Sequence, residues 1–185
     1  APLQRNQIAM LFEALRRSEK SWDDVDSWVA ELYGLGQSDL QIIVDTLAFN
    51  LPFADTKMLA QTPPDRQATA AFCVLLQNEL EPWAKRFNTR IVVRMLYSRP
   101  MSPWLGLLLR TGDDAPDGRL EQDWEALLSV GDATAATEMM VEDHSGALLI
   151  GRLAQSRYWS ATQAHILAQH IIWSRIDFLR GINRG

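Results

Sequence analysis

A segment rich in arginine and aromatic residues is the part of this sequence whose residue types best suit binding. Residues 151–160 read GRLAQSRYWS and contain Arg152, Arg157, Tyr158 and Trp159, just before a helix that we expect to begin at Ser160. Arginine and free helix amides can hold a phosphate, and an aromatic face can stack on a base. A structural reading stays open, in which the two aromatic residues pack the start of the helix onto a sheet while the arginines extend along its surface.

A second candidate is the tetrapeptide Asn50-Leu51-Pro52-Phe53, because an Asn-x-Pro-aromatic motif holds the target amine in N6-adenine methyltransferases. Such enzymes also need a glycine-rich turn for the methyl donor. The nearest match, at residues 31–36, lies only fourteen residues upstream of Asn50 and leaves no room for a doubly wound sheet between them. We therefore interpret Asn50 as a helix terminus.

The remaining reactive side chains do not form a known catalytic or metal-binding pattern. His165 and His170 are five residues apart, which does not fit the i, i+4 spacing of a shared metal on a helix. The aspartates at 113–117 lack the register of a calcium loop, and Ser145 next to His144 has no nucleophile elbow. Cys73 lies on an apolar helical stripe, as a core residue would. We expect no catalytic residue, no metal and no cofactor.

Charge is distributed unevenly along the chain, whose net charge is -5. Residues 1–84 carry -6, residues 85–110 carry +6 without any acidic residue, residues 111–146 carry -9 and residues 147–185 carry +4. An overall acidic chain is a poor binder of polyanions, but a local patch forms if the two basic blocks meet in space. Alternatively, the basic and acidic blocks pair with each other. Arg94 in the first block and Arg175 in the second join the four residues above as predicted partner or nucleic-acid contacts.

The N-terminal third has the periodicity of consecutive helices. Apolar residues recur at helical spacing in three segments, which include Leu11, Trp28 and Ile43. Ser21 with Asp24 and Ser38 with Gln41 resemble capping boxes, and Gly34 suits a helix end. A fourth helix is expected over residues 66–87, with Pro82 kinking or shortening it near its end.

The period then changes from 3.6 residues to 2, which is typical of strands. Residues 90–97 alternate in polarity, and residues 104–110 form an apolar run short enough for a buried strand. A short helix near Trp124 and two further strands at 138–143 and 147–151 follow, joined through a predicted hairpin at 144–146. A long helix beginning at Ser160 and reaching Phe178 ends the chain.

These elements predict an α+β fold, in which N-terminal helices precede a small four-stranded, mainly antiparallel ββαββ sheet with a long C-terminal helix. We divide the chain into a helical segment at 1–62 and an α+β domain at 63–185, or treat both as one continuous domain. No apolar run approaches the ~20 residues of a membrane span. One cysteine and no visible secretory signal favour the cytoplasm.

Residues 24–35 read DVDSWVAELYGL and are followed by DLQII at 39–43, and together they resemble a segment near the C-terminus of large N6-adenine DNA methyltransferases. Those proteins belong to type IIG restriction-modification and related phage-defence systems. Residues 157–164, RYWSATQA, are similar to helix starts in the C-terminal tails of such proteins. The resemblance covers about a fifth of the chain. The glycine-rich turn for the methyl donor and a true Asn-Pro-Pro-Tyr/Phe motif are absent, so no catalytic residue is carried over.

The resemblance implies an accessory or C-terminal module, with catalysis on another domain or partner. We therefore expect a non-catalytic interaction module of a DNA-modification or phage-defence assembly, with a protein partner and with contacts to the DNA backbone. The alternative is a purely structural protein–protein interaction subunit without a nucleic-acid role, for which exposed tryptophans would be the anchors. A small enzyme with a site of dispersed polar residues is the third reading.

Overall fold

The computed structural model describes residues 2–96, 102–112, 120–134, 136–143 and 146–181, without the side chains of residues 2–5, 120–123 and 132–134. Five helices precede the first strand: α1 (Pro2–Arg16), α2 (Trp22–Tyr33), α3 (Gln37–Phe49), α4 (Ala54–Gln61) and α5 (Arg66–Arg86). The sheet-forming region follows, with β1 (Ile91–Leu96), β2 (Trp104–Thr111), α6 (Leu120–Thr134), β3 (Glu138–Glu142) and β4 (Leu148–Leu153). A 3-10 turn, η1 (Ser156–Tyr158), leads to α7 (Ala161–Ser174) and α8 (Ile176–Leu179).

The chain divides into two compact units, residues 1–44 and residues 45–185, with the division inside α3. The second unit thus includes residues 45–62 in addition to the 63–185 that the sequence assigns to the α+β domain. We describe each unit by itself.

The first unit consists of α1, α2 and the first part of α3. The α2 helix begins at a capping box: the Ser21 side chain accepts a hydrogen bond from the Asp24 N–H, and the Asp24 carboxylate accepts from the Ser21 N–H. It ends at Gly34, which has a φ of 67°. These two signals are confirmed. The Ser38 cap is wrong, because α3 begins at Gln37 and the Asp39 carboxylate accepts from the N–H of Gly36.

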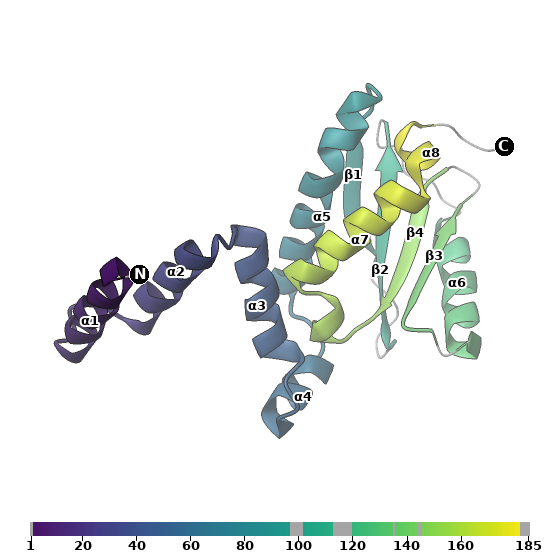
Figure 1. Ribbon diagram of the computed structural model, residues 1–185. Coiled ribbons are helices and arrows are strands. Elements are labelled where there is room, and N and C mark those ends of the chain that lie inside the picture. Colours follow the sequence, from purple (N-terminus) through teal and green to yellow (C-terminus); the bar gives the residue numbers. More distant parts are fainter. Residues whose placement is uncertain (1, 97–101, 113–119, 135, 144–145, 182–185) are drawn as a thin grey trace. The chain divides into compact units, whose positions relative to one another are not determined.

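The second unit is built around a fully antiparallel sheet with strand order β1-β2-β4-β3. The helices α5 and α7 cover one face, and α6 lies on the other, against β3 and β4 (Figure 1). Because neighbouring residues of a strand point to opposite faces, each strand contributes to both sides. In β2, for example, Leu107 and Leu109 pack beneath α5 and α7, whereas Trp104 and Leu108 pack beneath α6.

The face under α6 depends on a close approach between Trp124 of α6 and the glycines of the central strands. A Cβ atom at Gly106 would lie 2.6 Å from two ring atoms of Trp124 and 2.9 Å from the Cβ of Leu96. A Cβ at Gly151 would lie 3.4 Å from the same ring. Trp124 is therefore buried directly on the backbone of β2 and β4.

Three local expectations are corrected. The sequence does not predict the α4 helix. Its N-cap residue is Phe53, whose side chain makes no capping hydrogen bond, so the usual signal of a helix start is missing. Pro82 does not shorten the helix expected over residues 66–87, because α5 passes through the proline and ends at Arg86, with Trp83 and Ala84 packed into the core. The expected C-terminal helix is two helices, separated at Arg175, whose φ of -134° and ψ of 37° are not helical.

The α+β class is confirmed, with N-terminal helices, a four-stranded antiparallel sheet and C-terminal helices. The expected acidic loop at 113–118 and the hairpin residues His144 and Ser145 lie outside the described residues. In the described part of the chain, no helix has both the length and the apolar character needed to cross a bilayer.

Candidate nucleic-acid interface

The six residues predicted as contacts lie in different environments. Arg152 and Trp159 are buried, Arg157 and Tyr158 are half-buried, and Arg94 and Arg175 are exposed. The structure therefore separates the predicted contacts into a buried group around the end of β4 and two exposed arginines on other elements.

Arg152 is a core residue, with 4% of its surface exposed. Its Nε lies 2.8 Å from Oε2 of Glu138, the residue opposite it on β3. Its Nη2 donates to Oε1 of Gln163 on α7 at 2.9 Å, and its guanidinium lies 5.4 Å from the centre of the Phe72 ring. Burial lowers the pKa of Arg152, and the charge of Glu138 opposes that shift. These contacts tie β4 to β3, α5 and α7.

The aromatic pair of the same segment is also structural. Trp159 is 3% exposed, donates from its indole Nε1 to the Leu153 carbonyl at 2.9 Å and lies 5.0 Å from the Phe72 ring. Tyr158 packs at the margin of the same core, and the Arg157 guanidinium stacks 4.9 Å from its ring centre. Arg152 and Trp159, two of the predicted contacts, are thus enclosed by side chains of this chain.

At the start of α7, predicted as a phosphate-binding helix terminus, the amides of Thr162 and Gln163 are already bonded to side chains of this chain. Ser160 is the N-cap and accepts from the Gln163 N–H, as the sequence predicts. The second acceptor is Asp45, whose Oδ2 lies 2.7 Å from the Thr162 nitrogen. An internal carboxylate thus occupies the position in which an external anion would bind. Sequence spacing could not identify Asp45, because it precedes Thr162 by 117 residues.

A group of arginines lies instead on the sheet face opposite α5. Arg110 of β2 is directly opposite Val92 of β1, and Arg94 lies two residues beyond Val92 on the same strand. Arg90 lies two residues before Val92, immediately ahead of β1. Side chains two residues apart in extended backbone share a face, and diagonal neighbours across a strand pair lie ~7–8 Å apart. The register therefore gathers Arg90, Arg94 and Arg110 on one face.

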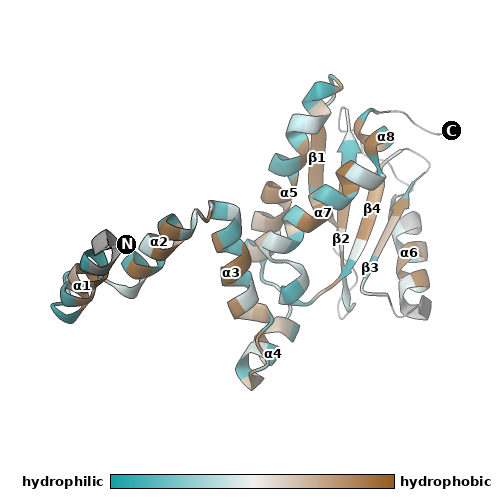
Figure 2. Ribbon diagram, viewed as in Figure 1, coloured by the Kyte–Doolittle hydropathy of each residue, from teal (hydrophilic) through white to brown (hydrophobic). Residues whose placement is uncertain are grey.

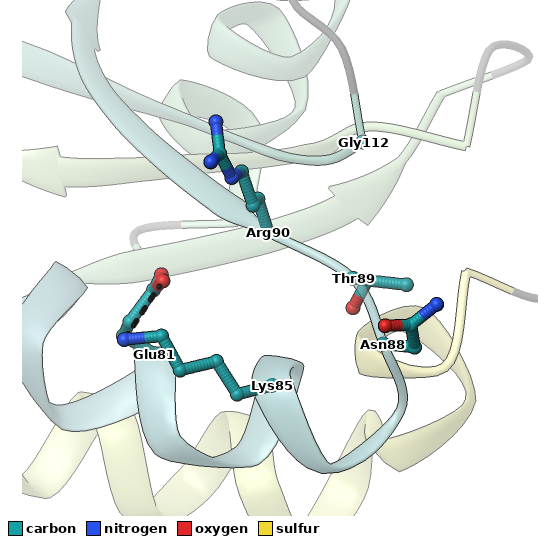
Figure 3. A pocket seen from close by; sticks show the side chains of 6 residues that line it. All are labelled: Glu81, Lys85, Asn88, Thr89, Arg90 and Gly112. Carbon is teal, nitrogen blue, oxygen red and sulfur yellow. Dashed lines mark ion pairs between the residues drawn. The ribbon is translucent and has the colours of Figure 1, made fainter.

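A surface pocket of about 450 Å³ adjoins this group at the end of α5 (Figure 3). It is lined by Glu81, Lys85, Asn88, Thr89, Arg90 and Gly112. The Lys85 ammonium lies 3.5 Å from the Glu81 carboxylate, and the Gly112 N–H donates to the Arg90 carbonyl. The pocket therefore offers two cations, one of them already paired, beside the exposed amide of Asn88.

The two basic blocks of the sequence meet next to this pocket. The Arg180 guanidinium, from the second block, lies 5.3 Å from the centre of the Phe87 ring, and the Thr89 hydroxyl donates to the Leu179 carbonyl. Arg86, from the first block, lies 5.7 Å from the Trp83 ring. We use the term basic surface for Arg90, Arg94 and Arg110, which the β1–β2 register places on one face.

The other reactive side chains have structural surroundings. Burial raises the pKa of the Cys73 thiol to about 11, which keeps the thiol protonated at neutral pH. His165 Nδ1 lies 3.4 Å from the Glu79 carboxylate, and the Asn50 N–H donates to the Thr46 carbonyl at the end of α3. Across the described ranges, no three histidine, cysteine or acidic side chains gather as metal ligands would.

Comparison of the chain with protein-family models, curated proteins and solved structures finds no match.

Proposed function

We propose that this chain is an interaction module that docks on a partner protein through the helices of its first unit. The observation that carries the proposal is the lack of a core in that unit. Among residues 6–44, the part of the unit whose side chains the structure describes, Ala30 alone is buried. A folded segment of this length normally encloses its apolar side chains.

The apolar stripes of these helices are present but uncovered. The exposed large side chains of the first unit are Ile8, Met10, Phe12, Trp22, Leu32, Tyr33, Ile42, Ile43 and Val44. Figure 2 shows the corresponding apolar turns along α2 and α3. Their aromatic members, of which Tyr33 is 73% exposed, are of the kind that anchors protein interfaces. Covering such side chains supplies the main favourable free energy of association.

The proposed assembly is a DNA-modification or phage-defence system, and the chain is its non-catalytic accessory part in the cytoplasm. The longer of the segments that resemble N6-adenine DNA methyltransferases, residues 24–35 with 39–43, covers most of α2 and part of α3. The resemblance and the uncovered apolar side chains thus occur in the same helices. This coincidence supports a methyltransferase subunit or domain as the partner.

The test measures binding of the 185-residue chain to an N6-adenine DNA methyltransferase of a type IIG system by biolayer interferometry. The variant Ile43→Glu places a charge on α3, and we expect it to weaken binding about tenfold or more. The control Val74→Glu makes the same kind of change at an exposed position of α5. Equal affinity of both variants, or no binding by the parent chain, would contradict the proposal.

Contact with the DNA backbone is the second candidate function, and the basic surface favours it. Arginine side chains grouped on one face of a sheet can neutralise neighbouring phosphates. The test is fluorescence anisotropy with short duplex and single-stranded DNA across a series of salt concentrations. Replacing Arg90 and Arg94 by alanine should reduce the log–log salt slope by about one per lost phosphate contact. Lys57→Ala with Arg66→Ala, at exposed positions of α4 and the start of α5, is the control that removes the same charge.

If DNA does not bind at low salt, the purely structural protein–protein role is the remaining reading. A tightly bound stoichiometric cofactor in native mass spectrometry would instead favour the reading as a small enzyme.

A further inference from the structure

An open strand edge beside an apolar groove lies on the second unit. The groove has a volume of about 650 Å³ and runs between α6 and β3. Its lining residues are Ala126, Leu127, Val130, Ala136 and residues 138–143. Val130 and Val141, on its two sides, are 57% and 39% exposed.

The strand that borders the groove is an edge strand of the described sheet. β3 is last in the strand order and pairs with β4 alone among the described strands. The Asp143 N–H donates to the Ala147 carbonyl, and the Leu153 N–H donates to the Thr137 carbonyl. Since hydrogen-bonded pairs alternate along an antiparallel ladder, the odd-numbered residues of β3 bond to β4. The N–H and C=O groups of Glu138, Met140 and Glu142 therefore point toward the open edge.

The two faces of β3 differ in chemistry. Met139 packs beneath α6 and Val141 lines the groove, so the odd-numbered side chains lie on the groove side. Glu138, Met140 and Glu142 lie on the side of α5 and α7. Three of the described residues that line the groove, Glu138, Glu142 and Asp143, are acidic, and none of them is basic. A cationic and apolar segment is therefore complementary to this edge.

We propose that β3 binds an extended segment of a partner protein as an added antiparallel strand, with apolar side chains in the groove and basic side chains opposite Glu138 and Glu142. The complementary pattern is Lys-Val-x-Val-Lys: the two lysines face the glutamates, and the two valines face Met139 and Val141 on the groove side. The central residue exchanges hydrogen bonds with Met140. This is strand addition to a sheet edge, with side-chain pockets adding selectivity.

The same arrangement argues against a second copy of this chain as the occupant. Antiparallel pairing of two β3 strands about Met140 would place Glu138 of each copy opposite Glu142 of the other. Like charges directly opposite each other on neighbouring strands are destabilising. Acidic side chains on an edge strand therefore block self-pairing while admitting a basic partner. This surface is independent of the helices of the first unit, so either proposal can fail without the other.

The experiment titrates the full chain, labelled with ¹⁵N, with the peptide acetyl-Gly-Lys-Val-Thr-Val-Lys-Gly-amide and follows amide shifts by NMR. We expect saturable shifts confined to β3 and α6.

Three peptides control the binding mode. Exchanging both lysines for glutamate should weaken binding about tenfold, and N-methylation of the central threonine, which removes its donor to the Met140 carbonyl, should weaken it about fivefold. Gly-Val-Lys-Thr-Lys-Val-Gly has the same composition with its faces exchanged and should not bind at this edge.

Variants of the chain test the same surface from the protein side. Met140→Pro removes the edge N–H without touching the ladder to β4, and Val130→Ser removes one apolar wall of the groove from an exposed position. Glu142→Lys reverses the edge charge, and Glu31→Lys on the exposed side of α2 is its matched control. Thermal unfolding checks each fold, and Val130→Ser keeps the test valid if Met140→Pro unfolds. Absence of shifts at millimolar peptide, equal binding of the face-exchanged peptide or insensitivity to Val130→Ser would overturn the proposal.

Discussion

The buried guanidinium of Arg152 and the half-exposed carboxylate of Glu138 form an ion pair across β4 and β3, with Nε 2.8 Å from Oε2. Glu138 also lines the groove beside β3, so the same carboxylate neutralises a core cation and borders a proposed binding edge. A change at Glu138 therefore affects both the stability of the sheet and the groove beside β3.

Removing Glu138 should be costly, because it leaves the Arg152 charge in the core without its nearest counter-charge. We expect Glu138→Ala to lower the free energy of unfolding by roughly 2–3 kcal/mol, less than the ~3–5 kcal/mol of a fully buried pair. Urea unfolding measures the change. The double variant with Arg152→Met should be more stable than Glu138→Ala alone, and a double variant of equal or lower stability would contradict the assignment.

Asp45 should stabilise α7 as its second N-terminal acceptor. Asp45→Ala removes the carboxylate that bonds to the Thr162 N–H, and we expect a loss of about 1–2 kcal/mol in the free energy of unfolding. Asp55→Ala on α4 is the control, since Asp55 is exposed. Equal stability of the two variants in urea unfolding would show that the α7 cap contributes nothing.

Gly106 should not tolerate a side chain. The Cβ of Gly106→Ala would lie 2.6 Å from Trp124, whose ring is held between α6 and the sheet. We expect a destabilisation of about 1–3 kcal/mol from overpacking. Gly36→Ala is the control, because its Cβ meets only the Asp39 carboxylate, at 3.7 Å. A Gly106→Ala variant as stable as the parent chain in thermal unfolding would mean that Trp124 is not packed against this strand.

Cys73 should react slowly in the native protein. Burial raises the pKa of its thiol from the ordinary 9.0 to about 11, so its thiolate fraction at pH 8 falls about a hundredfold. Reaction with Ellman's reagent should be slower by at least that factor than in urea. Because the unfolded chain loses this proton first, the contribution of Cys73 to stability is present below pH 9 and is lost as the pH rises toward 11. Equal rates in the two states would contradict this burial.

The fold was largely predictable because its elements have strong local signals. Ser21 with Asp24, Gly34 and Ser160 mark helix ends by short-range hydrogen bonds that the sequence alone specifies. The alternation around Arg94 likewise follows from strand geometry. Local signals fail where tertiary packing decides whether a helix continues. At Pro82, α5 continues because the residues that follow the proline are held in the core.

The candidate site was less predictable, because pairing between distant segments sets its geometry. The charges of Arg152 and Arg94 look alike in the sequence, yet Arg152 lies between β3 and α7 whereas Arg94 is exposed on an edge strand. The strand order places Arg152 on a central strand and Arg94 on an edge strand, and the spacing of residues along the sequence does not specify that order. Charge counting points to residues 85–110 as a basic region, although Arg90 and Arg110 were not among the selected contacts. Their joint position on one face follows from the β1–β2 register.

Hydrogen–deuterium exchange of the 185-residue chain, alone and with the proposed methyltransferase partner, tests the central proposal most directly. Helices without a core open easily, so amides of residues 6–44 should exchange rapidly in the isolated chain, while those of β2, β4 and α5 are protected. Adding the partner should protect α2 and α3 and leave the sheet unchanged. Protection of residues 6–44 as strong as that of β2 in the isolated chain, or no gain in protection in the complex, would contradict docking through these helices.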